Sequence, residues 1–556
     1  MKWRLTGTVL VALTALLYNL WNKYWIYIPG ILLSLKSPVA KNQRVSWDSF
    51  KPDNTSDRAA DNDPNIILIL VDDLGFNDIS FYGGGVFGGN ISTPHIDSIA
   101  HNGVSFLNAY TGHATCAPSR AALMTGRYAT RVGFEFTPTH PGYVKILGTS
   151  PKALRKGIYH KHLAEGLSTD NMTLPLSEVT MAQALADVGY RTLMLGKWHL
   201  GDTDETKPIR RGFHETLGFN LLSRSLPPGH TDAVDFRLDD MLDKFCWANV
   251  QYAVSKDGVG RMEPEGYLTD YFAEEASRAI EANRYRKFFM YMSFLAPHTP
   301  LQAHKKYYDQ LAHIEDELTR VYGAIILALD NAVGRILRSL KDTGLEDNTM
   351  VIFTNDNGAP NWIMRMDVNR PYRGWKGTLF EGGIRTPLFM QWPRVIPAGT
   401  VRSHPVSHID LFPTILSSTA DGRAALSSRE GELDGVNLLP YVTTLETPST
   451  PPPHETLYWR SGHYSALRRG EWKVQVAGNP NKKWLFNLKE DPAEHNNLAD
   501  VAGYENILYD MVDHLNKVAA TQREPIWPSI TETAIHIDKL FEHNETLEDE
   551  YVYWPN

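Results

Sequence analysis

Short apolar runs alternate with amphipathic helical patterns through most of the chain. The run Ile66–Val71 is continuous, rich in β-branched residues and followed by two aspartates, which is typical of a buried parallel strand. The alternation predicts an α/β fold in which helices sandwich a large, mostly parallel sheet. Further strands are predicted at Arg191–Gly196, Phe288–Phe294 and Thr349–Asn355, and helices at Val179–Val188 and Leu318–Lys341.

The pattern changes after residue 431. Thr443–Pro453 is rich in Thr and Pro, and four short alternating runs follow with turn residues between them. These runs predict a smaller C-terminal antiparallel sheet, and a helix is predicted over Gly503–Gln522. The four predicted strands are Leu457–Arg460, Tyr464–Arg468, Trp472–Val476 and Trp484–Leu488.

These changes divide the 556 residues into five segments. A chain of this length is too long for one typical core, so two folded units are expected. The expected segments are a signal anchor or signal peptide over 1–40, a linker over 41–64, the main domain over 65–431, a C-terminal subdomain over 432–530 and a tail over 531–556.

The N-terminus carries a targeting pattern. Lys2 and Arg4 precede the uncharged run Leu5–Trp21, and a second apolar run covers Tyr24–Leu35. Positive residues before an apolar run indicate a signal peptide or a signal anchor. The first run has 17 residues, the short limit of a membrane span, and no small-residue cleavage site follows it. We therefore expect an uncleaved membrane anchor rather than a cleaved signal.

Four N-x-S/T sequons agree with delivery into the secretory pathway. Each one alone is weak evidence, since the pattern often arises by chance. Together with the N-terminal pattern they predict a lumenal or extracellular glycoprotein, whose final compartment, the lysosome included, stays open. The sequons begin at Asn54, Asn90, Asn171 and Asn544.

The composition is that of a folded globular protein, with 42% hydrophobic and 21% charged residues. The net charge of −9 argues against nucleic acid as a partner, because nucleic-acid binders usually carry a basic excess. Cys116 and Cys246 are the two cysteines, so a disulfide framework does not hold the fold together. The oligomeric state is not readable from the sequence.

The segment beginning at Cys116 carries the strongest motif. It reads Cys116-x-Pro118-Ser119-Arg120-x4-Thr125-Gly126-Arg127, which resembles the signature of the formylglycine-dependent sulfatases. Blocks at Gly196–Gly201 and Asn355–Gly358 are similar to two further family motifs. The resemblance runs from Asn65 to Leu498. It implies an alkaline-phosphatase-like fold with residues 65–431 as the catalytic domain of an arylsulfatase-type enzyme.

The resemblance also implies that a dedicated formylglycine-generating enzyme oxidises Cys116 to an aldehyde, which then hydrates. One hydroxyl of the hydrate attacks sulfur, and loss of the second hydroxyl's proton expels sulfate and restores the aldehyde. A serine would stay sulfated, because it lacks that second hydroxyl. Taken alone, a single cysteine is more often a buried structural thiol, and the surrounding motif overrides that interpretation.

Acidic and amide side chains follow two predicted strands. Asp72 and Asp73 come directly after one, and Asp356 and Asn357 after another. Alone, such residues are often turn or cap residues, but together they supply the hard oxygen ligands that Ca²⁺ or Mg²⁺ prefers. By resemblance, these four residues bind one Ca²⁺, with residue 116 as a further ligand.

Five cationic or titratable residues match family positions: Arg120, Lys197, His199, His298 and Lys376. Taken singly, lysines are usually solvated, and a lone histidine is usually a structural hydrogen-bonding group. By resemblance, Lys197 and Lys376 hold the sulfate oxygens, and Arg120 holds the residue-116 side chain. His298, or Lys376 beside it, protonates the leaving oxygen, and His199 accepts the proton that lets sulfate leave.

Two alternatives remain beside sulfate ester hydrolysis. Some phosphonate and phosphodiester hydrolases of the same superfamily share the cysteine signature, and their substrates are tetrahedral anions of similar size. An inactive protein that binds sulfated ligands is the third interpretation, and the intact set of site residues argues against it. The physiological substrate, a sulfated small molecule or saccharide, is not encoded in any readable pattern.

Three arginines lie shortly before Lys376, namely Arg365, Arg370 and Arg373. Arginine forks bind carboxylates and sulfates bidentately, so these residues could bind a second anionic group of a polyanionic saccharide. The alternative is a solvated loop with structural ion pairs. The sequence does not decide between the two.

Overall fold

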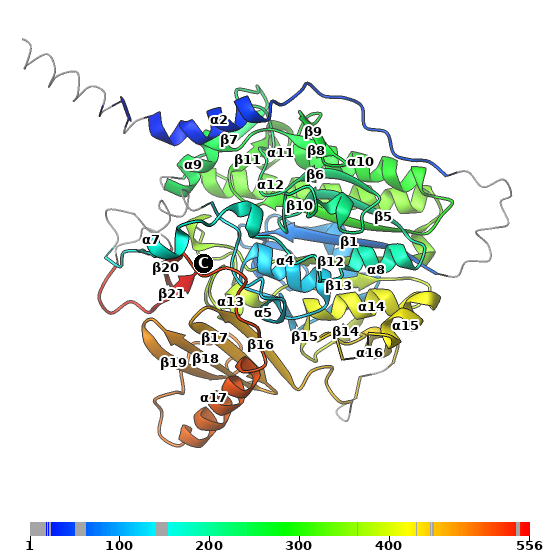
Figure 1. Ribbon diagram of the computed structural model, residues 1–556. Coiled ribbons are helices and arrows are strands. Elements are labelled where there is room, and N and C mark those ends of the chain that lie inside the picture. Colours follow the sequence, from blue (N-terminus) through cyan, green and yellow to red (C-terminus); the bar gives the residue numbers. More distant parts are fainter. Residues whose placement is uncertain are drawn as a thin grey trace, which may run out of the picture.

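The computed structural model describes residues 18–556 except 19, 22–23, 51–62, 141–153, 239–240, 364, 430, 445, 448–449 and 541–544. Its centre is a ten-stranded sheet in the order β14-β2-β13-β12-β1-β10-β5-β6-β8-β9 (Figure 1). The strands are β1 Asn65–Asp72, β2 Val104–Phe106, β5 Arg191–Lys197, β6 Glu215–Phe219, β8 Val254–Lys256, β9 Val259–Met262, β10 Phe288–Pro297, β12 Thr349–Asn355, β13 Leu388–Gln391 and β14 Thr400–Arg402.

The central strands β12, β1, β10, β5 and β6 are parallel, and β13 and β8 flank them in antiparallel orientation. In register, Leu68 of β1 lies between Tyr291 of β10 and Ile352 of β12. All four strands predicted for the main domain belong to this parallel group, so the predicted fold class is confirmed. Their carboxyl ends lie at one edge of the sheet, where α/β proteins bind ligands.

Helices cover both faces of the sheet (Figure 1). Alternate side chains of β1 point to opposite faces, so Ile67 packs in the core with α3, α10 and α12, and Ile66 in the core with α4, α8 and α14. This two-sided burial explains why β1 is apolar at consecutive positions. The helices are α3 Pro94–His101, α4 Cys116–Thr125, α8 Met181–Asp187, α10 Leu268–Ala282, α12 Glu317–Asp342 and α14 Leu411–Ser417.

The C-terminal subdomain is a four-stranded antiparallel meander with one long helix, as predicted. The helix α17, Glu505–Ala519, packs Met511 and Leu515 on one face of the sheet. The other face packs against the main domain through residues such as Phe380. The strands are β16 Thr456–Ser461, β17 Tyr464–Arg469, β18 Trp472–Gly478 and β19 Asn481–Asn487.

Residues 531–556, expected as a tail, instead contain two strands. β20 (Thr531–His536) and β21 (Tyr551–Pro555) pair with each other, and β20 also pairs with β4 (Ile158–Tyr159). The side chain of Trp554 reaches the loop that carries Lys376, because a Cβ built on Gly377 would lie 3.1 Å from its ring. The end of the chain therefore packs against the main domain.

The segment before β1 also lies on the main domain. Trp47, within the expected linker, is buried, and its indole donates a hydrogen bond to Glu275. The helix α2 (Ile28–Lys36) contacts α9 (Met241–Asn249). Among the described residues no helix is both long and apolar enough to cross a membrane, and nearly all of the predicted anchor run Leu5–Trp21 lies outside those residues.

The remaining elements are short and lie around this frame. Two small two-stranded pairs, β7 with β11 and β3 with β15, connect loops at the edges of the main sheet. Their bounds are β3 Ala109–Tyr110, β7 Ala233–Phe236, β11 Leu301–His304 and β15 Val406–Ser407, and the short helices are α5 Ala129–Val132, α7 Lys161–Ala164, α11 Lys305–Tyr308, α13 Glu381–Ile384, α15 Ala420–Ser427 and α16 Leu439–Thr443.

Candidate active site

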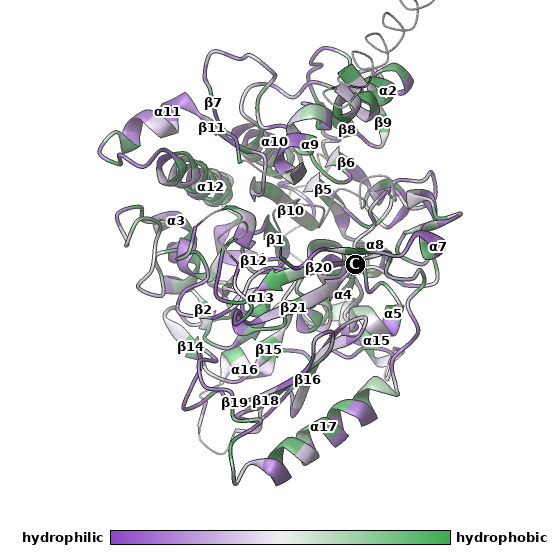
Figure 2. Cartoon of the chain, turned by 90° about the vertical axis from the view of Figure 1, so that its left-hand side faces the viewer, coloured by the Kyte–Doolittle hydropathy of each residue, from purple (hydrophilic) through white to green (hydrophobic). Residues whose placement is uncertain are grey.

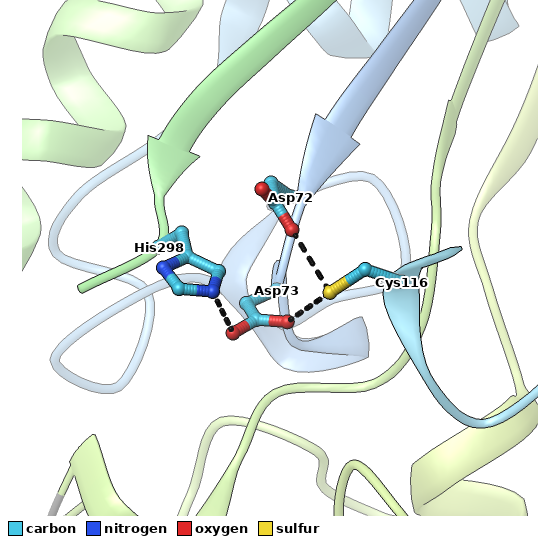
Figure 3. A group of neighbouring side chains, drawn as sticks. All are labelled: Asp72, Asp73, Cys116 and His298. Atoms are coloured by element: carbon cyan, nitrogen blue, oxygen red, sulfur yellow. Dashed lines mark hydrogen bonds and ion pairs between the residues drawn. The ribbon is translucent and has the colours of Figure 1, made fainter. Parts of the chain in front are cut away.

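Polar side chains gather where four neighbouring parallel strands end. Asp72 ends β1 and is followed by Asp73, Lys197 ends β5, and His298 follows β10. Asp356 follows β12 and lies beside β1, since its backbone N–H donates to Val71. Because these strands are adjacent in the sheet, residues that are far apart in sequence meet at one edge (Figure 3).

Cys116 is the first residue of α4 and points at this edge (Figure 3). Its Sγ lies 3.4 Å from Oδ1 of Asp72, 3.9 Å from Oδ1 of Asp73 and 2.9 Å from Nζ of Lys376. Burial, and next the charge of Asp356, raise the pKa of the Cys116 thiol well above its ordinary value. An unmodified thiol here stays protonated at neutral pH and is a poor nucleophile.

The acidic groups fit a hard cation. Ligand atoms of Asp72, Asp73, Cys116 and His298 all lie within 4.8 Å of one another. Oδ2 of Asp73 and Oδ1 of Asn357 are buried and accept no hydrogen bond, which is costly for a polar oxygen without another partner. Carboxylate and amide oxygens of this kind suit Ca²⁺ or Mg²⁺.

Buried cations balance these carboxylates. Arg120 lies against Asp356, with Nε at 2.9 Å and NH2 at 2.7 Å from its Oδ2, and NH1 donates to Ser293 at 2.6 Å. Lys197 Nζ lies 2.5 Å from Oδ2 of Asp72. Burial alone would raise the pKa of Asp72, but the charges of Lys197 and Arg120 hold it below its ordinary value.

Lys376 pairs with the second of the two aspartates at the end of β1. Its Nζ lies 2.6 Å from Oδ1 of Asp73. Burial would lower its pKa, but Asp73 and the neighbouring anions raise it above the ordinary value, so Lys376 carries its proton at neutral pH. Two fixed cations therefore face the same small volume in front of Cys116, which is a suitable place for a tetrahedral dianion.

Two neutral histidines complete the site. Burial lowers the pKa of His199 well below its ordinary value, assisted by the charges of Lys197 and Arg120, and burial also lowers the pKa of His298. Nδ1 of His298 is 2.6 Å from the carbonyl oxygen of Thr299, so as an N–H it donates there and leaves Nε2 unprotonated, 3.4 Å from Oδ2 of Asp73. Neither ring nitrogen of His199 has a hydrogen-bond partner.

The predicted site residues are thus brought together. Direct contacts link all of them except His199, which is buried among them without a hydrogen-bonded contact to the others. The linked residues are Asp72, Asp73, Cys116, Arg120, Lys197, His298, Asp356, Asn357 and Lys376. Their catalytic and metal-binding roles remain predictions.

Sequence reasoning missed two supporting residues. Ser293 accepts from Arg120, and the ring of Trp362 lies 5.7 Å from Nζ of Lys376. A serine in an otherwise apolar buried strand was a readable signal for Ser293. Trp362 gave none, because a single tryptophan in a loop is most often part of a core.

A second buried charge network joins the C-terminal sheet to the main domain, and no local pattern predicted it. Nζ of Lys473 lies 2.8 Å from Glu381 and 2.9 Å from Glu494. NH1 of Arg385 lies 2.8 Å from Oε2 of Glu381 and 2.8 Å from the hydroxyl of Tyr110. Tyr110 is part of this network.

The arginines before Lys376 have different surroundings. Arg373 forms ion pairs with Asp538 and Glu550 of the C-terminal segment. Arg365 pairs with Asp367 at 2.7 Å, and Arg370 is exposed. For Arg365 and Arg373 the structure therefore favours the structural ion pairs over recognition of a second anionic group.

Comparison with known proteins agrees with this geometry. The family model described as Sulfatase matches residues 64–421, and the model described as N-sulphoglucosamine sulphohydrolase, C-terminal, matches residues 373–521. The first match spans the whole ten-stranded sheet and every predicted site residue.

Individual relatives point the same way. N-acetylgalactosamine-6-sulfatase from Canis lupus familiaris is 31% identical over 74% of this chain and 71% of its own length. Steryl-sulfatase from Mus musculus is 31% identical over 68% of this chain and 65% of its own length. The crystal structure of Ps i-CgsB in complex with k-i-k-neocarrahexaose has 30% identity and a TM-score of 0.67, covering 84% of this chain and 94% of that one. The chain belongs to the sulfatase family and is a sulfuric ester hydrolase.

Proposed function

We propose that this sulfatase uses Cys116, oxidised to formylglycine by a formylglycine-generating enzyme, and one Ca²⁺ to remove sulfate from a sulfated saccharide. The observation that carries the proposal is the position of Cys116 at the start of α4, 2.9 Å from Lys376 and in contact with Asp72. The raised pKa of the thiol argues against direct use of the cysteine. The hydrated aldehyde would supply an oxygen nucleophile for sulfur and a second hydroxyl whose deprotonation expels sulfate.

The chain's own cations would bind the sulfate group. Lys197 pairs with Asp72 and Lys376 with Asp73, so an anion in front of residue 116 would meet both ammonium groups. Their charges stabilise negative charge that moves onto the leaving oxygen. Arg120 is held by Asp356 and lies inside the site, so its role is to fix the carboxylate and the residue-116 side chain.

The two histidines would move protons. Both are neutral near pH 7, because burial lowers their pKa values. The free ring nitrogens of His199 can accept the proton whose loss releases sulfate. Lys376, or His298 after its Nε2, which faces Asp73, has taken up a proton, would protonate the leaving alcohol or phenol.

Asp72, Asp73, Asp356 and Asn357 would hold the Ca²⁺, together with residue 116. Support comes from the two buried oxygens without hydrogen bonds, on Asp73 and Asn357. The ion would neutralise sulfate oxygens and lower the pKa of the nucleophile.

A saccharide substrate is favoured by the names of the relatives. One acts on N-acetylgalactosamine 6-sulfate by its name, and another was solved with a neocarrahexaose. Steryl-sulfatase, a relative of similar identity, makes a sulfated sterol the competing substrate.

We also propose that the enzyme works in the lumen of the secretory pathway or outside the cell. The N-terminal targeting pattern supports this location, and so does the exposure of two sequon residues, Asn90 and Asn171. A glycan at either position would meet solvent rather than the core.

Three measurements on one preparation test the proposal. Mass analysis of the residue-116 peptide from a host with the generating enzyme should show the aldehyde or its hydrate, and elemental analysis should show calcium. Turnover of a phenyl sulfate should exceed that of the phosphodiester of the same phenol. Faster phosphodiester cleavage would move the assignment to a phosphodiesterase, and unmodified cysteine without turnover would leave a sulfated-ligand binding protein.

A further inference from the structure

The helix α2 presents an apolar stripe to solvent. Ile28, Ile31, Leu32 and Leu35 follow the i, i+3, i+4, i+7 spacing of one helix face, and their side chains are between 38% and 77% exposed. In a surface helix this stripe normally faces the core. Figure 2 shows α2 as a green, apolar element at the periphery of the molecule.

Polar contacts fix this orientation. On the inner side, the N–H of Gly30 donates to Oδ1 of Asn249 at 2.6 Å, and Ser34 accepts from Gln251 at 2.5 Å. A Cβ at Gly30 would lie 3.0 Å from the backbone of Ala248, so α2 and α9 meet closely along this side. The helix therefore has a polar inner face and an apolar outer face, the reverse of the usual arrangement.

Aromatic side chains extend the exposed apolar surface toward the N-terminus. Tyr18, Trp21, Tyr24 and Tyr27 are between 48% and 65% exposed. Tyrosine and tryptophan are enriched where proteins meet the headgroup region of a bilayer, because their rings are apolar and their polar ends stay wet. A groove of about 940 Å³ beside them, lined by residues such as Trp21, Ile28 and Tyr252, adds further apolar surface.

The charge of this segment matches an anionic surface. The first acidic residue of the chain is Asp48, and four lysines and arginines lie between the predicted anchor run and this residue. The whole chain, by contrast, has a net charge of −9. Cations next to an apolar face attract anionic lipid headgroups. The absence of acidic residues before Asp48 therefore favours an anionic bilayer over a soluble protein as the partner of this face.

We propose that α2 and the aromatic residues before it lie flat in the interface of a bilayer that contains anionic lipids, and that they hold the folded enzyme against the membrane surface. The nine residues of α2 extend about 14 Å, too short to span a bilayer but suitable for lying in its interface. The apolar stripe would enter the acyl region, and Lys36 and Lys41 would meet the headgroups. This inference is independent of the substrate and of the chemistry at Cys116.

The test measures the position of α2 relative to the bilayer, so membrane binding through the apolar run Leu5–Trp21 cannot be mistaken for binding through α2. Full-length protein carries a single environment-sensitive fluorophore on Leu32→Cys or, as the matched control, on Tyr509→Cys of α17, which is 72% exposed. Both native cysteines are buried and react slowly. The labelled proteins are mixed with vesicles of phosphatidylcholine and phosphatidylserine that contain lipids with a quencher near the headgroup.

On vesicles, the label at position 32 should shift to the blue and be quenched about twofold or more, while the label at position 509 stays in water. Omitting phosphatidylserine should weaken the effect at position 32. Equal, water-like signals at both positions in vesicle-bound protein would overturn the proposal. A blue shift at position 32 that depends on protein concentration and not on vesicles would also overturn it, and would indicate a second copy of the chain as the occupant.

Discussion

Replacing Lys473 by Met should destabilise the junction between the main domain and the C-terminal sheet. Lys473 bridges Glu381 and Glu494, and all three side chains are inaccessible to solvent. Removing the cation leaves two buried carboxylates without the ammonium group that they share. The two residues stay linked by the backbone N–H of Glu381, which donates to Oε2 of Glu494 at 2.5 Å. Breaking a buried pair in this way costs about 3–5 kcal/mol.

The cost should depend on pH. Burial raises the pKa of Glu494 to about 7, and loss of Lys473 should raise it further. A folded-state pKa above the unfolded value gives stability at low pH that is lost as the pH rises through the folded pKa. Relative to the wild type, the free energy of unfolding of Lys473→Met should therefore rise by up to about 1.4 kcal/mol for each pH unit as the pH falls toward 7.

Urea unfolding of both proteins at pH 6 and pH 8.5 measures the effect. Lys482→Met is the matched control, because Lys482 pairs with Glu550 but is 38% exposed, and its loss should cost less than about 1 kcal/mol. Adding Glu494→Gln to Lys473→Met should restore part of the stability. If Lys473→Met lay within about 1 kcal/mol of the wild type at pH 8.5, the reasoning about this network would be refuted.

Four further outcomes are expected. Arg120→Lys should lower kcat roughly 100-fold in a sulfate-release assay, because lysine cannot reproduce the fork on Asp356. Asp356→Ala should lose bound metal, seen by elemental analysis, together with turnover. Arg373→Ala should reduce turnover of a sulfated oligosaccharide and of phenyl sulfate equally, because its partners belong to the protein; a loss confined to the oligosaccharide would contradict this. Burial raises the pKa of Asp78 to about 7, so the stability that this group contributes is fully present below about pH 4 and is lost as the pH rises through 7, and Asp78→Asn should flatten the fall in unfolding free energy between about pH 4 and 7.

The catalytic constellation could be predicted because two local signals coincide. Asp72, Lys197 and Asp356 each follow or end a buried apolar strand, and parallel strands bring their carboxyl ends to one edge. The motif at Cys116 then supplied the chemistry. Where a strand pattern and a motif agree, sequence distance is no obstacle to predicting contact.

The supporting contacts could not be predicted in this way. Lys473 lies in a strand whose alternating pattern predicts that one face is buried, but the pattern does not identify an ion-pair partner. That partner, Glu381, is 92 positions away in the sequence. The strands over 531–556 pair partly with β4, a contact set by tertiary packing rather than by their own pattern. Arg373 was a candidate for binding substrate because its ion-pair partners could not be predicted. Those partners, Asp538 and Glu550, lie in the segment that was expected to be a tail.

The position of Lys376 shows why these supporting contacts matter for the chemistry. Its backbone N–H donates to Ala359 after β12, and the next N–H, of Gly377, donates to Ala114 beside Cys116. Gly377 has a φ of 85°. The side chain of Ile535 in β20 lies so close that a Cβ added to Gly377 would be 2.8 Å from it. The ammonium group that contacts Cys116 is thus held between the catalytic sheet and the last strands of the chain. If Lys376 has the proposed role, an error of about 1 Å in its position is enough to cost a large part of the rate, and the C-terminal strands then help to set that position.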